Sequence, residues 1–203
     1  MSKENKRIII GYYNKSVILT FVGILISIFG MLNVANTDIA LTCLILAGIC
    51  DLFDGVVARK CKRTDKEKAF GVQIDSLADV ISFLMFPVVF ALFNSDNKIL
   101  AMIVAGIYVL AGVERLGWFN VNQEEGKTRY YDGLPVTYSA LIIPIVNVVF
   151  ELLKIQFKYT NYIILVILAF LYVVNVKMKK PTGVWYIIFS CLAIATIVVI
   201  HLV

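Results

Sequence analysis

Four aspartates, Asp51, Asp54, Asp75 and Asp79, stand close together in a chain that is 60% hydrophobic. The first two are three residues apart and the last two are four apart, so on helices each pair lies along one face. Carboxylates near a bilayer are costly unless they are paired or bind a metal. Two adjacent antiparallel helices would bring the pairs face to face, where divalent cations would remove their mutual repulsion. Ligands that are all carboxylate oxygens favour Mg²⁺ or Mn²⁺, with Ca²⁺ as a third candidate, over zinc.

Small residues and one arginine accompany these acids. Gly55 and Ala58 continue the face of the first pair, Arg59 follows, and Gly71 begins the face of the second pair. Such a surface lets a flat base or a pyrophosphate approach the backbone, while two metals would neutralise phosphate oxygens and a leaving group. An aspartate that is not fully used as a ligand could take a proton from an incoming hydroxyl. A single acid at a helix end could instead be an interfacial residue or an ion-pair partner of Arg59, but four acids at helical spacing favour a metal site.

Membrane helices must position these residues. The chain has 203 residues, 16% of them charged, and a mean hydropathy of +0.86. A chain of this composition has more apolar side chains than a soluble domain of its size could bury. Apolar runs near the ~20 residues that a helix needs to cross hydrocarbon predict seven spans, at Ser16–Leu32, Ile39–Val57, Val72–Phe93, Ile99–Phe119, Pro135–Leu153, Tyr162–Val176 and Val184–Val203. The predicted fold is therefore an all-α integral membrane protein, with one membrane domain over residues 1–203.

The distribution of positive charge predicts the orientation. If the N-terminus is cytoplasmic, all but Lys98, Lys154 and Lys158 of the nineteen lysines and arginines lie on the cytoplasmic side. The aspartates then lie at the cytoplasmic face of the cell membrane, beside a predicted loop at Lys60–Phe70. The net charge of +5 indicates this topology and contact with anionic lipid, not nucleic-acid binding. Basic and apolar residues alternate over Lys3–Tyr13, which predicts a short helix on the membrane surface, with a frayed basic tail as the alternative.

The aspartate stretch carries a family resemblance. Its pattern D-x-x-D-G-x-x-A-R … G-x-x-x-D-x-x-x-D, from Asp51 to Asp79, resembles the signature of the CDP-alcohol phosphotransferase family. Members of this family are membrane enzymes that cleave a CDP-linked donor and join its phospho-group to an alcohol, with release of CMP. One departure is the gap of eleven residues between Arg59 and Gly71, where many members have about eight.

The resemblance implies a role for each matched position. The main metal ligands would be Asp51, Asp54 and Asp75. Asp79 would act as the general base and would also touch a metal. The CDP pocket would be shaped by Asp51, Gly55, Ala58, Arg59 and Gly71. The family further implies a homodimer and a core of six spans around a cavity that is open to cytoplasm and lipid, so the seventh, C-terminal span would be an addition.

A second stretch, residues 112–138, concerns the acceptor alcohol. Here an R-L-x-x-F-N run containing Arg115 and Asn120 precedes G-L-P at Gly133 to Pro135, and this resembles the bacterial and archaeal phosphatidylserine synthase branch. The resemblance implies transfer of a phosphatidyl group from CDP-diacylglycerol, or an archaeal lipid equivalent, to serine. The guanidinium fork of Arg115 could meet the serine carboxylate. The ammonium group could meet Asn120, Glu114 or Asp132.

Two departures keep other acceptors open. Trp118 stands where that branch has a second arginine, and Thr137 stands where it has another proline. The same chemistry with glycerol 3-phosphate, inositol phosphate or another polyol is therefore an alternative. A phosphorylated acceptor would need two or more basic residues near the fourth span, where Arg115, Lys127 and Arg129 occur. A metal-ion transporter is a more distant alternative. Transport sites usually lie near the middle of the membrane, whereas these aspartates are expected at its cytoplasmic face.

Overall fold

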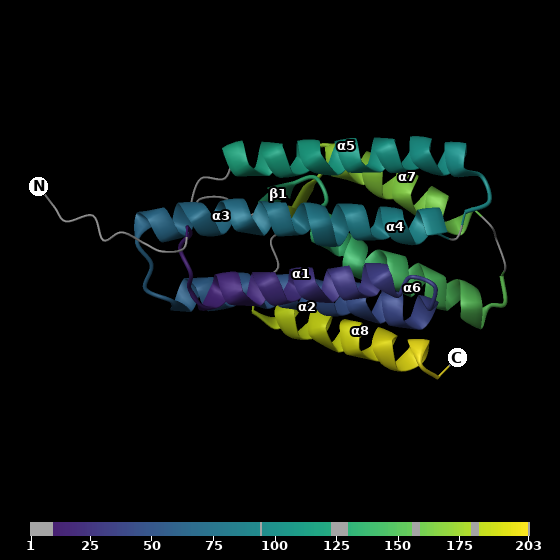
Figure 1. Ribbon diagram of the computed structural model, residues 1–203, viewed down its shortest axis with the longest axis horizontal. Coiled ribbons are helices and arrows are strands. Elements are labelled where there is room, and N and C mark those ends of the chain that lie inside the picture. Colours follow the sequence, from purple (N-terminus) through teal and green to yellow (C-terminus); the bar gives the residue numbers. More distant parts are fainter. Residues whose placement is uncertain (1–9, 94, 123–129, 156–158, 180–182, 203) are drawn as a thin grey trace, which may run out of the picture.

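The structure, a computed structural model, describes residues 10–93, 95–122, 130–155, 159–179 and 183–202 (Figure 1). Within these ranges four helical segments are long and apolar enough to cross a membrane. They are α1 (Lys15–Leu32), α2 (Thr37–Lys60), the continuous run α3 (Asp65–Asp79), η1 (Val80–Met85) and α4 (Phe86–Phe93), and α5 (Lys98–Asn122). The predicted multi-pass membrane protein is confirmed.

Three shorter apolar helices complete the seven predicted segments. These are α6 (Ser139–Leu152), which a 3₁₀ turn η2 (Val136–Tyr138) extends at its start, α7 (Thr160–Val173) and α8 (Val184–Ile200). With 14 residues, α7 is about 21 Å long, which is less than the roughly 30 Å of hydrocarbon in a typical bilayer. All seven segments are thus helical, and four of them have the length of a full span.

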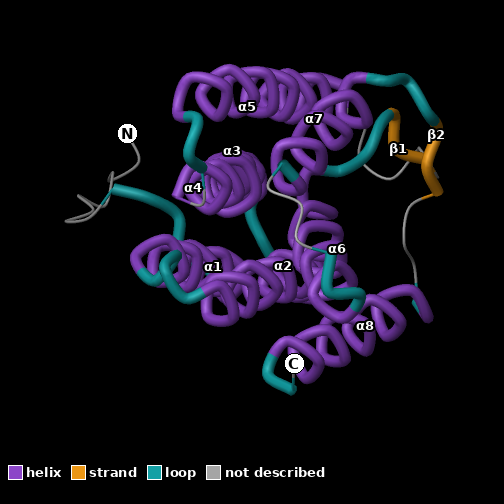
Figure 2. The backbone as a smooth tube through the Cα atoms, turned by 90° about the vertical axis from the view of Figure 1, so that its right-hand side faces the viewer, coloured by secondary structure: helices purple, strands orange, loops and turns teal. Residues whose placement is uncertain are grey.

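The helices form one bundle that is seen end-on in Figure 2. In it α5 packs on α7, α1 packs on α2, and α2 also contacts α6 and α8 (Figure 2). The run from α3 to α4 lies between the α5–α7 pair and the other helices, because η1 contacts α1, α2 and α5. Small and hydroxyl side chains let α1 approach this central helix closely, as Ser27 shows by donating to Ser82 of η1 at 2.8 Å.

The loop before α3 is shorter than the sequence predicts. The predicted loop at Lys60–Phe70 is wrong, because α2 ends at Lys60 and α3 begins at Asp65. A capping box starts α3 early: the Glu67 amide donates to the Thr64 hydroxyl at 3.3 Å, and the Thr64 amide donates to Glu67 Oε2 at 2.7 Å. The signal T-x-x-E was therefore present in the sequence. The early start places Gly71 and the second aspartate pair on a helix that is already formed.

Loss of this cap should loosen the beginning of α3. We expect Thr64→Ala to lower the free energy of unfolding by about 1 kcal/mol, because it removes the oxygen that satisfies the Glu67 amide. Thermal unfolding of detergent-purified protein measures this change. Thr64→Ser, which keeps the hydroxyl, is the matched control and should unfold as the wild type does. Equal stability of Thr64→Ala and the wild type would show that the capping box contributes nothing.

A π-helical segment follows Asp79 directly. It precedes Pro87, which has no N–H group to donate to the carbonyl of Phe83 one turn earlier. Two hydroxyl groups take over: Tyr108 of α5 donates to the Phe83 carbonyl at 2.7 Å, and Ser139 of α6 donates to it at 3.3 Å. Since π segments often occur at functional sites, this junction fixes α3 against α5 and α6 just beyond the last aspartate.

The all-α prediction is incomplete, because the structure also contains two short strands. β1 (Tyr130–Asp132) pairs with β2 (Lys177–Lys179) in an antiparallel ribbon, with Tyr130 opposite Lys179 and Asp132 opposite Lys177. The ribbon forms because the connections α5–α6 and α7–α8 leave the bundle at the same end, where unpaired backbone groups can bond to each other. It ties the acceptor-side segment to the connection that leads into α8.

The predicted surface helix at Lys3–Tyr13 falls mainly on residues 1–9, which lie outside the described part of the chain. For Ile10–Tyr13, which is described, the prediction is wrong: these residues are not helical, and Gly11 has a φ of 131°. Helix α1 begins only after Asn14, whose side chain accepts hydrogen bonds from the amides of Ser16 and Val17. That cap fixes the first helical turn at Lys15.

Candidate active site

Three of the aspartates converge in space. Asp51 and Asp54 come from the second half of α2 and Asp75 comes from α3, and each can offer one carboxylate oxygen within 4.8 Å of the other two. Asp54 is buried, and its Oδ2 accepts a hydrogen bond from the Thr20 hydroxyl at 2.6 Å. The helical spacing therefore does bring the two pairs face to face. This group could hold a metal ion.

Asp79 lies one turn further along α3, deeper in the bundle. Its side chain is buried, and its Oδ1 has no hydrogen-bond partner among the described residues. The Asp51 carboxylate interacts with Asp79 and with the Thr137 hydroxyl. A buried carboxylate oxygen without a partner is costly. Together with the three convergent acids it is a donor set that suits hard divalent cations, so these residues fit the metal that the sequence predicts.

The aspartates line a polar cavity of about 340 Å³ between α1, α2, α3, α5 and η2. Eleven of the site residues predicted from the sequence lie on its wall: Asp51, Asp54, Gly55, Ala58, Arg59, Gly71, Asp75, Asp79, Arg115, Asn120 and Pro135. The predicted residues Gly133, Glu114 and Asp132 are not among its lining residues. The donor-side and acceptor-side residues, which are far apart in the sequence, therefore share one space.

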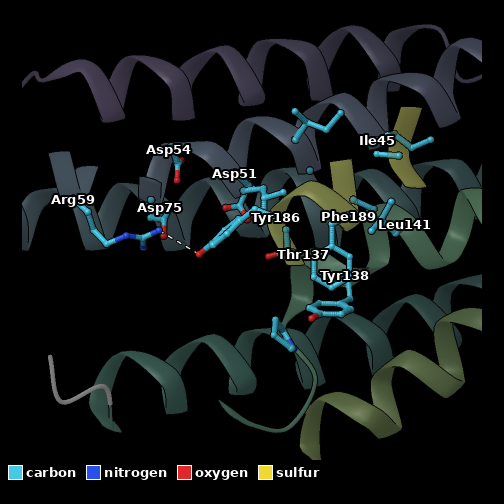
Figure 3. A pocket seen from close by; sticks show the side chains of 17 residues that line it. Ile45, Asp51, Asp54, Arg59, Asp75, Thr137, Tyr138, Leu141, Tyr186 and Phe189 are labelled. Carbon is cyan, nitrogen blue, oxygen red and sulfur yellow. Dashed lines mark hydrogen bonds between the residues drawn. The ribbon is translucent and has the colours of Figure 1, made fainter. Parts of the chain in front are cut away.

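A second, more apolar cavity of about 210 Å³ shares Asp51, Asp54 and Asp75 with the first. Figure 3 shows the side chains that line this second cavity. It shares seven residues with the polar cavity: Asp51, Asp54, Gly55, Arg59, Asp75, Pro135 and Thr137. The rest of its wall comes from α2, η2, α6 and α8: Ile45, Gly48, Ile49, Leu52, Tyr138, Ala140, Leu141, Tyr186, Phe189 and Ala193. Arg59 stands at the junction, where its Nη2 donates to the Tyr186 hydroxyl at 3.2 Å (Figure 3).

On the acceptor side, Arg115 and Asn120 project from α5 into the polar cavity. Arg115 is buried, its Nη2 donates to the Gly133 carbonyl at 3.5 Å, and its guanidinium carbon lies 5.5 Å from the centre of the Phe119 ring. Asn120 is fixed by Ser76 of α3: its Nδ2 donates to the Ser76 hydroxyl at 2.8 Å, and that hydroxyl lies 3.1 Å from its Oδ1. Contacts within the protein thus hold the guanidinium group of Arg115 and the side-chain amide of Asn120 in place.

Glu114, Trp118 and Asp132 lie elsewhere. They line a separate cavity of about 230 Å³ beside the β-ribbon, and none of them lines the cavity that holds the four aspartates. Of the three groups expected to meet an ammonium ion, Asn120 is the one in that cavity. Trp118, at the position of the missing second arginine, also lies outside the cavity of the aspartates.

Several residues of the site were not predicted from the sequence. Arg63 lines the polar cavity, Thr20 bonds to Asp54, Thr137 interacts with Asp51, and Tyr186 bonds to Arg59. Thr20 had a usable signal, because a hydroxyl residue one turn after Ser16 marks a polar face in an otherwise apolar span. Tyr186 had none, because its partner lies 127 residues away.

Gly133 supports Arg115 from outside the cavity. Its φ of +77° is unfavourable for other residues, and a Cβ built there would lie 2.7 Å from the Tyr172 carbonyl oxygen. We expect Gly133→Ala to lower the free energy of unfolding by about 1–3 kcal/mol, as thermal unfolding in detergent would show. Gly106→Ala, where a Cβ meets nothing within 4 Å, is the control. A Gly133→Ala protein as stable as this control would contradict the constraint.

Comparison with known proteins decides the family. A sequence model of CDP-alcohol phosphatidyltransferases matches residues 14–174, from the cap of α1 to the end of α7. The chain belongs to the CDP-alcohol phosphatidyltransferase family. The resemblance inferred from the aspartate pattern is therefore confirmed. The match contains all four aspartates of this phosphatidyltransferase, while α8 lies beyond its end.

Curated relatives of this phosphatidyltransferase carry names that include serine. It is 38% identical over 124 residues to the archaetidylserine synthase of Methanothermobacter thermautotrophicus. These aligned residues are 61% of this chain and 50% of that protein. It is 33% identical over 181 residues to the CDP-diacylglycerol–serine O-phosphatidyltransferase of Methanocaldococcus jannaschii, covering 87% of the chain and 83% of the relative. The enzyme of that name from Saccharomyces cerevisiae is 35% identical over 108 residues, which are 49% of this chain and 38% of the yeast protein. The chain thus spans half of the first relative and most of the second.

Proposed function

We propose that this phosphatidyltransferase moves the phosphatidyl group of CDP-diacylglycerol, or of an archaeal lipid equivalent, to L-serine, giving a phosphatidylserine-type lipid and CMP. The observation that carries the proposal is the convergence of the four aspartates with Arg115 and Asn120 on one cavity. The serine-specific names of relatives at 33% and 38% identity support the choice of acceptor. Residues 1–203 would act as one catalytic membrane domain.

The metal-binding role falls to the aspartates. Asp51, Asp54 and Asp75 would hold Mg²⁺ or Mn²⁺, with Ca²⁺ a further candidate, and Asp79 would add an oxygen from the deep side. Bound divalent cations would neutralise charge on the pyrophosphate of the donor. Thr20 keeps the Asp54 carboxylate oriented toward the cavity by its 2.6 Å hydrogen bond.

Asp79 would be the general base. In the proposed reaction it takes the proton of the serine hydroxyl, and the serine oxygen forms a bond to the lipid-side phosphorus. The bond from that phosphorus to the bridging oxygen breaks, and CMP leaves with its electron pair. The position of Asp79 suits this role, since it lies one helical turn after Asp75 and lines the cavity in which the hydroxyl would approach the metals. The proton on Asp79 then returns to solvent before the next turnover.

The CDP group would bind along the glycine-lined wall of the cavity. A Cβ at Gly55 would first meet Arg59 Nη1 at 3.6 Å, and one at Gly71 would meet Arg63 Nη1 at 3.5 Å. Both glycines therefore leave space that is bordered by a guanidinium group. Such space, with Ala58 on the same wall, suits an anionic pyrophosphate and a flat base that approach the helix backbone closely.

Arg115 and Asn120 would bind serine. The guanidinium fork pairs well with a carboxylate, and the Gly133 carbonyl together with the Phe119 ring fixes its direction. Pro135 lines the same wall. Glycerol 3-phosphate and inositol phosphate remain alternatives, but within the described residues α5 brings one cation, Arg115, into this cavity. Lys127 and Arg129 lie outside the described part of the chain.

The orientation and the assembly are also proposals. With the N-terminus in the cytoplasm, the aspartate cavity opens at the cytoplasmic side, where sixteen of the nineteen lysines and arginines would lie. This placement gives serine and the CDP group access from water and gives the lipid chains access from the bilayer. A homodimer is the assembly we propose, on the basis of the family.

An acceptor panel tests the choice of serine. Purified protein with Mn²⁺ and CDP-diacylglycerol is supplied with serine, glycerol 3-phosphate, inositol phosphate or no acceptor, and CMP release is measured. We expect release that depends on serine. Release that depends on another alcohol would retain the family chemistry and contradict the assignment of Arg115 and Asn120 to serine.

A further inference from the structure

Helix α8 lies beyond the segment that matches the family, yet it forms part of the site. It packs on α2 and α6, and three of its residues, Tyr186, Phe189 and Ala193, line the apolar cavity. Figure 3 shows Tyr186 and Phe189 on its wall. Their spacing of three and four residues puts them on one helical face. The other face of α8 is exposed and apolar, as Ile187 and Ile194 show with 64% and 57% exposure, which suits contact with lipid.

Two contacts hold the cavity-facing side of α8. At the polar end the Tyr186 hydroxyl accepts the hydrogen bond from Arg59 Nη2 at 3.2 Å. Deeper in, the Phe189 ring packs edge-on against Tyr138 of η2, with ring centres 5.6 Å apart and an interplanar angle of 79°. Tyr186 therefore restrains the guanidinium of Arg59 at the place where the polar and apolar cavities meet.

The residues that line the apolar cavity favour one kind of occupant. Whatever fills the apolar cavity lies beside Asp51, Asp54, Asp75 and Arg59 at one end and beside aliphatic and aromatic side chains along the rest. A molecule that matches both ends carries phosphate at one end and hydrocarbon at the other. Serine and free nucleotides lack the hydrocarbon, so the lipid donor is the reactant that fits.

We propose that α8 is a donor-recognition element of this enzyme. This inference rests on the proposed function. Tyr186 is a positioning residue that holds Arg59 ready for a donor phosphate, and Phe189 with Ala193 forms the wall against which one hydrocarbon chain of the donor lies. The segment that the family model covers would thus supply the reaction chemistry, and α8 would add affinity for the lipid donor.

Steady-state kinetics of the whole 203-residue chain test the role of Tyr186. We expect Tyr186→Phe, which keeps the ring and removes the hydroxyl, to raise KM for CDP-diacylglycerol about three- to tenfold, with kcat changed less than twofold and KM for serine unchanged. It should weaken inhibition by free CDP by a similar factor, because Arg59 would meet the phosphates of both. Ser190→Ala is the matched control, since it removes an α8 hydroxyl that donates within its own helix, to the Tyr186 carbonyl.

A second variant tests the apolar wall. Phe189→Ala should raise KM for a long-chain donor several-fold and leave inhibition by CDP unchanged, whereas Ile187→Ala on the exposed face should change neither. If Tyr186→Phe and Phe189→Ala both bind the donor as tightly as the active wild type, the role of α8 is refuted while the proposed function stands. If the wild type releases no CMP with any acceptor, the proposed function fails and this inference fails with it.

Discussion

Asp79→Asn should reduce the rate of CMP release by about 10²–10⁴-fold, because an amide cannot take the proton of the attacking hydroxyl. The Asp79 side chain lines the polar cavity that the other three aspartates also line, so its carboxylate can meet a substrate hydroxyl there. Single-turnover measurement of CMP release with saturating serine checks the expected loss. Asn is close in size to Asp, so the packing around α3 should persist.

Two control variants test whether the expected loss of activity comes from losing the general base or from losing one negative charge. Asp38→Asn removes a carboxylate from the first turn of α2, at the other end of that helix from Asp51 and Asp54, and should leave the rate unchanged. Asp79→Glu would keep a carboxylate but displace it, and intermediate activity is expected. If Asp79→Asn retained full activity, the proposed base would be wrong, and the proton would have to leave by another route.

The second large effect concerns metal binding and stability together. Asp51, Asp54 and Asp75 lie close enough for their carboxylates to repel one another strongly when no cation is bound. We therefore expect Mn²⁺ to raise the unfolding temperature of the wild type, since a ligand at about one hundred times its Kd adds about 2.7 kcal/mol to the free energy of unfolding. Asp54→Asn should lose most of this gain and most of the CMP release.

Without a bound metal, Asp54→Asn should be more stable than the wild type. In EDTA we expect Asp54→Asn to be more stable than the wild type by about 1–3 kcal/mol, because one of the repelling charges is gone. Its side-chain oxygen can still accept the hydrogen bond from Thr20. Thermal unfolding in EDTA and in Mn²⁺ measures both effects. A wild-type protein with the same unfolding temperature in both solutions would contradict metal binding by this cluster.

The contrast between the two aspartates is informative. Asp79→Asn removes the negative charge of the Asp79 carboxylate but leaves the three convergent carboxylates in place. It should therefore retain most of the stabilisation by Mn²⁺ while it loses catalysis. Asp54→Asn should lose both. Equal loss of metal stabilisation in the two variants would make Asp79 mainly a ligand and would leave the base unassigned.

The sequence was informative where the signal is local. Spacings of three and four residues determine which side chains share a helical face, so spacing alone placed the two aspartate pairs together with their small neighbours. Hydrophobic length likewise predicted the seven helical segments, with differences of a few residues at most ends. The start of α3 at Asp65 was missed although its capping signal, Thr64 and Glu67, is also local.

Other parts of the site had no local signal. The hydrogen bond from Arg59 to Tyr186 joins residues 127 positions apart, and the bond from Thr20 to Asp54 spans 34 positions. Such contacts depend on how the helices pack, which hydropathy does not encode. The β-ribbon was missed for the same reason, because it forms only where two connections meet at one end of the bundle. The contribution of α8 to the site likewise depends on its packing against α2 and α6.

The most direct test of the proposed reaction compares two products in one experiment. Purified protein is incubated with CDP-diacylglycerol, labelled serine and Mn²⁺, and the CMP released is measured against the label that enters the lipid phase. We predict equal molar amounts of the two, both abolished by EDTA. CMP release without labelled lipid would contradict transfer to serine, and label in lipid that survives EDTA would contradict the metal-dependent role of the aspartates.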